Sequence, residues 1–325
     1  MDNRIVPATG ALLEQILDAT YPLWGEGLSR ASYARLNAAQ LKTPWGAAHL
    51  QRTALVSGPD RLLSTAKQYD LRARLDGRPV RVLGVGAVFT PPDLRRRGLA
   101  ALLMERILDE GRRAGFDLAL LFSAIGPDYY RRFGFEPVPI DQFSLDIGYR
   151  PGAPAIVVRA GSDRDVPFLV EMHEARAAAS RPRFALERDA DFIRFAITRK
   201  RLLAGLGPAG LRHLEYFVVE EGERPAAYAV VLRANGDRML MECADRDASG
   251  ARVGALLQVL FARTPSERSP IVRAWLPPGF RPPQIEVVRG ERSSVVMMVR
   301  SLTPAAAVAP PLTAGDVIYW LGDMV

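Results

Sequence analysis

The chain of 325 residues is 48% hydrophobic and 24% charged, a composition that excludes a disordered protein and predicts about two domains. Its formal charge of +7 comes mainly from arginine, since only three of the 43 basic residues are lysines. The sequence has no basic run interleaved with aromatic residues, so it gives no indication of a nucleic-acid-binding surface. The single cysteine, Cys243, excludes an intrachain disulfide, and the three scattered histidines predict no metal site.

No stretch approaches the roughly 18 uninterrupted apolar residues of a membrane span. The start, MDNRIVPATG, lacks the layout of a secretory signal. We therefore expect a cytoplasmic protein with no membrane partner, and a homo-oligomer is compatible with the sequence.

Strand and helix patterns alternate over the first part of the chain. The expected elements are a strand at 4–7, helices at 11–24 and 29–41, and strands at 52–57, 61–75 and 80–89. The turn sequences SGPD and DGRP separate the last three strands, so these strands should form an antiparallel meander.

The run TPPDLRRRGLAALLMERIL, starting at Thr90, joins the third of these strands to an amphipathic helix that closes near Gly115. LALLF at 118–122 follows as a buried strand, and strand–helix–strand crossovers of this kind are parallel. A short helix in GPDYYRRFGF, ending at Gly134, and a strand at 143–147 complete the first part of the chain.

The second half repeats this order in weaker form after the linker-like sequence RPGAPA at 150–155. We expect helical structure at 163–201, three strands within 215–244, a helix at 250–261 and a strand at 270–276. The predicted domains are therefore 1–150 and 151–303, followed by a tail at 304–325.

The arginine-rich turn before the helix has the features of an anion site. The first N–H groups of a helix lack intrahelical partners and lie at the positive end of its dipole. Gly98 and Ala100 leave room for a phosphate, and Arg95, Arg96 and Arg97 add positive charge. A polyphosphate is the expected ligand, and a solvated basic loop is the alternative. The nearby LGVGAVF is a poor dinucleotide fingerprint, since Phe89 replaces its third glycine.

Two motifs carry a resemblance to a known family. RRRGLA from Arg95 resembles the R/Q-x-x-G-x-G/A signature of the GNAT (GCN5-related N-acetyltransferase) superfamily, and YYRRFGF resembles its Y-x-x-F/L-G-F motif. The duplicated order is similar to the tandem-GNAT Eis (enhanced intracellular survival) acetyltransferases, which acetylate aminoglycosides and lysine side chains. The resemblance implies an α/β fold with mixed sheets. More specifically, it implies a tandem GNAT acyl-CoA N-acyltransferase fold whose second copy is degenerate.

The resemblance implies acetyl-CoA as co-substrate, with no metal. The residues expected to hold it are Val88, Phe89, Thr90, Arg95, Arg96, Arg97, Gly98, Leu99, Ala100, Ala101 and Ser123. Tyr130 matches the family's general acid, with a phenol pKa of about 10 that keeps its proton at neutral pH, and Tyr129 is the alternative if the register is shifted by one. A backbone N–H near Phe89 would donate to the developing oxyanion.

The last ten residues, DVIYWLGDMV, are too apolar to be left in water, so the tail should be docked. By resemblance, the terminal carboxylate of Val325 would enter the active site as the base; the alternative is a tail that merely seals the second domain. The resemblance also implies Glu26 and Asp323 as carboxylates for a cationic acceptor; the alternative is that each is a plain surface charge.

The second copy is expected to be silent, since ARVGALLQVL holds Ala251 where the first signature arginine would stand. Deleting the residues after about Arg150 should then abolish turnover more than acetyl-CoA binding. The predicted function is acetyl transfer to a primary amine of a small polyamine, an aminoglycoside-like molecule or a lysine. A non-catalytic acyl-CoA sensor on the same fold is the alternative, and a nucleic-acid binder ranks third.

Overall fold

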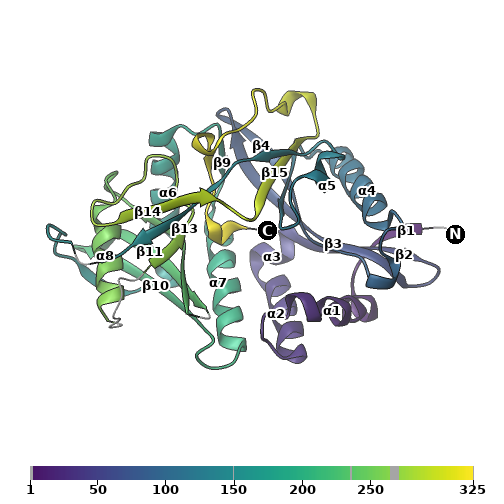
Figure 1. Ribbon diagram of the computed structural model, residues 1–325, viewed down its shortest axis with the longest axis horizontal. Helices are drawn as coiled ribbons and strands as arrows, with labels where there is room; N and C mark the ends of the chain where they lie inside the picture. The colour runs from purple at the N-terminus through teal and green to yellow at the C-terminus, as the bar shows by residue number, and fades with distance from the viewer. Residues whose placement is uncertain (1–2, 149, 235, 264–270, 325) are drawn as a thin grey trace. The chain divides into compact units, whose positions relative to one another are not determined.

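The computed structural model describes residues 3–148, 150–234, 236–263 and 271–324, and the chain forms two compact units (Figure 1). The first unit contains the chain up to Val138 together with Ser294–Leu312, and the second contains Pro139–Ser293 together with Thr313–Met324. These borders differ from the predicted ones at 150 and 303, because the strand just before each predicted border, at 141–146 and at 296–301, pairs in the sheet of the other half.

The first unit holds the predicted strands, meander and helices. Its main elements are β1 Asn3–Pro7, α1 Gly10–Trp24, α2 Arg30–Lys42, α3 Pro44–His49, β2 Leu50–Ser57, β3 Arg61–Leu75, β4 Arg78–Phe89, α4 Leu99–Arg113, β5 Leu118–Ser123, α5 Asp128–Arg131, β6 Glu136–Val138 and β15 Val296–Ser301. The sheet order is β1-β2-β3-β4-β5-β15-β6, in which β4 and β5 pair parallel as expected of a strand–helix–strand crossover. The predicted α/β fold with mixed sheets is confirmed.

Helices cover both faces of this sheet because successive residues of a strand point to opposite sides. On β2, Leu55 packs in the core that contains α4, while Ala54 and Val56 pack with Leu12 and Ile16 of α1. All five side chains are buried, and each Å² of apolar surface removed from water stabilises the fold by roughly 25 cal/mol.

The second unit repeats the arrangement. Its main elements are β7 Asp141–Asp146, β8 Val157–Ala160, α6 Val166–Ser180, β9 Phe184–Leu186, α7 Ala190–Leu206, β10 Arg212–Glu221, β11 Arg224–Ala234, β12 Asp237–Asp245, α8 Ala251–Ala262, β13 Ile271–Ala274, β14 Glu286–Arg292 and β16 Val317–Ile318. The sheet order is β14-β7-β13-β12-β11-β10-β8. On β11, Ala229 and Val231 face the core around α8, and Tyr228 and Val230 face α6 and α7.

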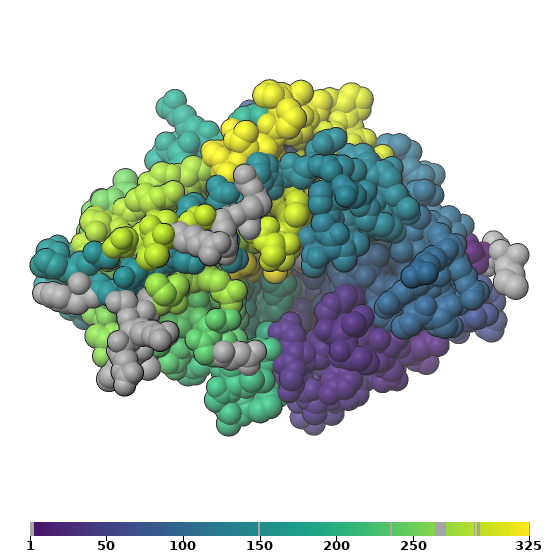
Figure 2. Space-filling model, viewed as in Figure 1, coloured from purple at the N-terminus to yellow at the C-terminus, as the bar shows by residue number. Residues whose placement is uncertain are grey.

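In each of these two strand orders, one strand comes from the other half of the sequence. β7, which follows β6 in the chain, pairs with β13 and β14 in the second unit. β15, which follows β14, lies between β5 and β6 in the first unit and pairs antiparallel with both. Figure 2 shows these late residues in yellow against the teal residues that follow α4. The chain is therefore a duplication with reciprocally exchanged strands.

In the described ranges, no helix is long and apolar enough to cross a membrane. Nor do the described histidine, cysteine, aspartate and glutamate side chains form any group of three or more that could hold a metal ion.

Candidate functional site

The start of α4 presents backbone N–H groups without a side-chain cap. Its N-cap is Gly98, in the left-handed conformation at φ 74°, and among the described residues no side chain accepts a hydrogen bond there. A Cβ built on Gly98 would meet no atom within 4 Å, so the space over the turn is open. The first turn of α4 also carries no acidic residue. This helix start therefore has the properties of an anion site.

The arginines before α4 are exposed, and two of them are hydrogen-bonded within the turn. Arg95 Nε donates to the carbonyl oxygen of Thr90 at 3.2 Å, and Arg97 Nη2 donates to that of Asp93 at 3.1 Å. Arg96 takes a left-handed φ of 62°, unusual for a residue with a side chain. These hydrogen bonds stabilise the conformation of the turn. The three arginine side chains remain exposed to solvent, where their positive charge attracts anions.

β4 and β5 separate beside this helix start. They pair from Val82–Leu118 to Val85–Leu121, and the pairing ends there although both strands continue. Beyond that point β4 has one residue more than β3, a bulge in which Ala87 takes φ 49°. A bulge increases the local twist of a strand, and the residues of β4 after Val85 have no partner on β5. Val88, Phe89 and Ser123, three of the predicted cofactor residues, lie on these two strand ends.

Hydrogen bonds fix the two strand ends. Ser64 Oγ donates to the carbonyl oxygen of Phe89 at 2.9 Å and lies 3.0 Å from Thr90 Oγ1. On the other strand, Ser123 Oγ donates to the carbonyl oxygen of Gly126 at 2.6 Å. The Ser123 hydroxyl therefore closes the turn that leads to α5, so its predicted contact with the cofactor stays a prediction.

Tyr130 and Tyr129 differ in environment. Tyr130 is 8% exposed and packs edge-on against Tyr129 and Phe135, with ring centroids 5.0 and 6.3 Å away. Burial raises the pKa of Tyr130 to about 12. It also raises the pKa of the half-buried Tyr129, and the Arg132 guanidinium lies over the Tyr129 ring, 4.4 Å from its centroid. The Tyr130 hydroxyl is therefore protonated throughout the physiological pH range.

The end of α1 packs against the end of β4. The Trp24 ring meets Phe89 edge-on, with centroids 6.1 Å apart, and the exposed Glu26 follows two residues later at φ 48°. Glu26 therefore lies close in sequence to a residue that contacts the predicted site. Sequence analysis missed Arg52 of β2, which is 6% exposed and whose Nη1 has no hydrogen-bond partner in the described part of the chain. Burial lowers the Arg52 pKa.

At the equivalent helix start in the second unit, side chains of the protein itself occupy the position that an anion would take. Gly250, at φ 72°, precedes α8 as Gly98 precedes α4. The backbone N–H groups of Arg252 and Val253 donate to Asp245 Oδ2 at 2.9 and 3.3 Å, so a buried carboxylate takes the anion position. A Cβ on Gly250 would lie 2.5 Å from the Phe280 ring, which covers the turn.

This geometry corrects the sequence alignment of the two copies. The left-handed glycine before the helix is Gly250, four residues before the Gly254 of ARVGALL, so Ala251 does not correspond to Arg95. Counting back from Gly250 instead places Asp247 opposite Arg95. The second turn therefore carries an acidic residue where the first carries a basic one, which favours the expectation that the second copy is silent.

Replacing Asp245 with alanine should destabilise the protein by about 2 kcal/mol, because two buried N–H groups lose a charged acceptor. Urea unfolding monitored by far-ultraviolet circular dichroism would measure the loss. Glu174→Ala, an exposed acidic position on α6, is the control and should change stability by less than about 0.5 kcal/mol. An equal loss in both variants would contradict this role of Asp245.

The tail is anchored within the second unit by buried charges. Asp323 is 3% exposed and forms an ion pair with Arg188 at 3.3 Å, and Arg188 also pairs with the buried Glu242. Lys200 Nζ donates to the carbonyl oxygen of Gly322 at 2.7 Å, and Arg199 Nη2 to that of Met324 at 2.9 Å. Burial raises the pKa of Asp323 and lowers that of Lys200.

The docked tail confirms the expectation from its apolar composition. Trp320 is fully buried in the core around α8. The Asp323 carboxylate is engaged by Arg188, so its predicted contact with a substrate stays a prediction that this burial does not favour. Val325 lies outside the described residues.

Comparison with known proteins now identifies the first unit. Residues 23–138 match the family described as Acetyltransferase (GNAT) domain, which covers the helix start, the β4–β5 gap and Tyr130. The first unit is a GNAT domain. An N-acetyltransferase of Streptomyces avermitilis, uncharacterized by its description, is 28% identical over 168 residues, which are 49% of this chain. The match spans only 41% of that relative's length.

Solved structures resemble the chain over almost its whole length. A GCN5-related N-acetyltransferase from Kribbella flavida has a TM-score of 0.70 at 22% identity, covering 95% of this chain and 73% of that one. Eis1 from Mycobacterium abscessus has a TM-score of 0.54 at 17% identity, covering 95% and 75%. A tandem GNAT protein from the clavulanic acid biosynthesis pathway has 0.53 at 14%, covering 93% and 99%. These likenesses show a tandem GNAT fold.

Proposed function

We propose that the chain is an acetyl-CoA-dependent N-acetyltransferase acting on a primary amine. The observation that carries the proposal is the pairing of an open, uncapped helix start at Gly98 with a separated β4–β5 edge in the same unit. The first suits the diphosphate of coenzyme A, and the second suits its extended pantetheine arm. The GNAT family match of this unit supports the same reaction.

The residues present fit acetyl-CoA. The N–H groups from Leu99 to Ala101 and the guanidinium groups of Arg95 to Arg97 would hold the diphosphate, with the open space over Gly98 admitting it. Val88, Phe89 and Thr90 would offer strand backbone to the pantetheine arm. When bound, acetyl-CoA supplies the activated acyl group. The backbone N–H near Phe89 would donate to the carbonyl oxygen as negative charge develops there.

Tyr130 would stabilise the departing thiolate. Its pKa of about 12 lies well above the roughly 8.5 of an ordinary thiol, so the hydroxyl holds its proton and would act first as a hydrogen-bond donor to sulfur. The terminal carboxylate of Val325 is proposed as the acceptor of the amine proton through water, since an α-carboxylate with a pKa near 3.5 is a weak base. Glu26 is proposed to attract a polycationic acceptor, such as an aminoglycoside-like molecule or a polyamine; lysine side chains are the other acceptor class.

Tyr130→Phe tests the chemistry. Turnover, measured as thiol released from acetyl-CoA against a panel of amines, should fall by about 10² or more while acetyl-CoA affinity stays unchanged. Tyr129→Phe is the matched control and should retain turnover; the reverse result would move the role to Tyr129. If acetyl-CoA binds yet no amine gives thiol release in the wild type, the chain is an acyl-CoA sensor.

Replacing Arg95, Arg96 and Arg97 together with glutamine tests the anion site. Acetyl-CoA affinity, measured by titration calorimetry, should fall about 10- to 100-fold, and its dependence on salt should weaken. The control removes the same charge elsewhere on the unit, at Arg4, Arg112 and Arg131, whose side chains are about half exposed. Equal losses of acetyl-CoA affinity in the two triple variants would show that the effect comes from net charge and not from a specific site.

A further inference from the structure

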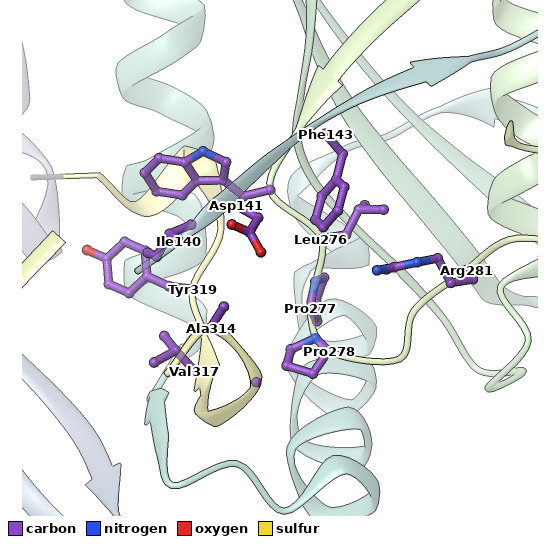
Figure 3. Close-up of a pocket in the computed structure, with 12 residues that line it drawn as sticks. Ile140, Asp141, Phe143, Leu276, Pro277, Pro278, Arg281, Ala314, Val317 and Tyr319 are labelled. Atoms are coloured by element: carbon purple, nitrogen blue, oxygen red, sulfur yellow. The ribbon is translucent and has the colours of Figure 1, made fainter. Parts of the chain in front are cut away.

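The second unit contains a cavity of about 200 Å³ that the proposed acetyl transfer does not use (Figure 3). Its walls come from the start of β7, the loop that follows β13 and the segment that leads into β16. All of its lining residues belong to the second unit. The helix start and the β4–β5 gap of the first unit have no part in it.

Apolar and aromatic side chains form most of the lining. Trp275 and Tyr319 are buried at 2% and 4% exposure, and Phe143, Leu276, Pro277 and Val317 complete the apolar surface. A dry apolar cavity of about 150 Å³ is large enough to hold benzene. This cavity therefore has room for a ring with a short substituent.

Two charged side chains border the cavity, and they are placed differently. Figure 3 shows Asp141 between the Tyr319 ring on one side and Phe143 and Leu276 on the other. Arg281 is exposed, donates through Nη1 to the carbonyl oxygen of Phe280 at 2.8 Å and lies 4.9 Å from the Phe143 ring centroid. The two charges therefore border different parts of the lining, the exposed Arg281 at the rim and Asp141 among the aromatic walls.

Aromatic faces beside a carboxylate attract a weakly hydrated cation. The negative faces of tryptophan and tyrosine rings and a nearby carboxylate both favour positive charge, and the apolar walls favour a cation with a hydrocarbon body. We propose that this cavity binds a small organic ammonium ion, with its cationic nitrogen against Asp141, Trp275 and Tyr319 and its apolar part towards Val317 and Pro277.

A ligand in the cavity should also stabilise the packing of the tail. The Tyr319 hydroxyl donates to the carbonyl oxygen of Asp323 at 2.8 Å, so the ring that lines the cavity also holds the last turn of the chain. A ligand packed on this ring should stabilise the protein and protect the tail from carboxypeptidase.

The test uses the full-length chain and benzyltrimethylammonium chloride, a quaternary ion with no N–H to acetylate. Titration calorimetry should show saturable binding, with an increase in melting temperature. Benzyl alcohol, neutral, and benzenesulfonate, anionic, carry the same ring and should bind at least about tenfold more weakly. If benzenesulfonate binds as tightly or more tightly, Arg281 sets the charge preference and the proposal is wrong.

Asp141→Asn should weaken binding of the ammonium ion at least about tenfold, and Ala314→Phe should abolish it by filling the cavity from the wall. Asp163→Asn, at a carboxylate whose side chain is 77% exposed, is the matched control and should leave affinity unchanged. Circular dichroism establishes that each variant is folded. Unaltered affinity in both cavity variants, or no binding to the wild type, would overturn the proposal without bearing on acetyl transfer.

Discussion

A chain truncated after Arg150 is expected not to fold. The truncation removes β15, which lies between β5 and β6 and pairs with both. It also removes Met298, which is fully buried in the core around α4. Both strands would be left with unpaired backbone groups, each costly when buried, and the core with a cavity. Soluble yield and circular dichroism should report a loss of structure, with acetyl-CoA binding lost as well.

This expectation replaces the prediction that such a truncation mainly impairs turnover. The matched control is a shortened polypeptide in which the chain up to Val138 is joined to Ser294–Leu312 through a short glycine-serine linker. Val138 pairs with Met297 in the sheet, so a short linker suffices to connect these segments. The joined polypeptide should unfold cooperatively and bind acetyl-CoA. A cooperatively folded 1–150 fragment would show that β15 is dispensable.

Replacing Arg188 with methionine is expected to destabilise the protein by about 3–5 kcal/mol. Arg188 pairs with both Glu242 and Asp323, and all three side chains are 3% exposed or less. Its removal leaves two buried carboxylates without their partner, a situation that costs far more than losing a surface ion pair. Urea unfolding at pH 8 measures the loss. Arg194→Met, which breaks the exposed pair with Asp191, should cost less than about 0.5 kcal/mol.

The loss in Arg188→Met should depend on pH. Burial already raises the pKa of Asp323, while Arg188 lowers it, so the variant should raise this pKa further. A carboxyl group with a raised pKa in the folded state binds more protons than in the unfolded state, so stability falls as pH rises through this range. The difference between variant and wild type should therefore be smaller at pH 5 than at pH 8. A loss under 1 kcal/mol at both pH values would remove Arg188 from this role.

Local pattern was sufficient to predict most elements of both units and the helix start after the arginine turn in the first. α4 follows from its leucine spacing, and the open turn before it follows from Gly98 and the three arginines. The helix over 163–201 was only partly right, since the short strand β9 divides it into α6 and α7. Three residues in a strand give too short a pattern to detect.

The exchange of β7 and β15 was not predictable from the sequence. A short strand shows which of its faces is apolar but carries no information on which half supplies its partner. The buried ion pairs were not predictable either, because their partners are far apart in the sequence and a single charged residue is usually exposed. The residues are Arg188, Glu242 and Asp323. The alignment of the second turn failed because ARVGALL repeats the apolar pattern of the first helix four residues too late.

The Asp245 carboxylate at the start of α8 has a consequence for how the duplication is used. Two N–H groups that would otherwise be open to water or to an anion donate instead to a carboxylate of the protein itself. The start of α8 is therefore not expected to bind the diphosphate that is proposed for the start of α4. The proposed site at Gly98 therefore predicts a stoichiometry of one acetyl-CoA per polypeptide in a calorimetric titration.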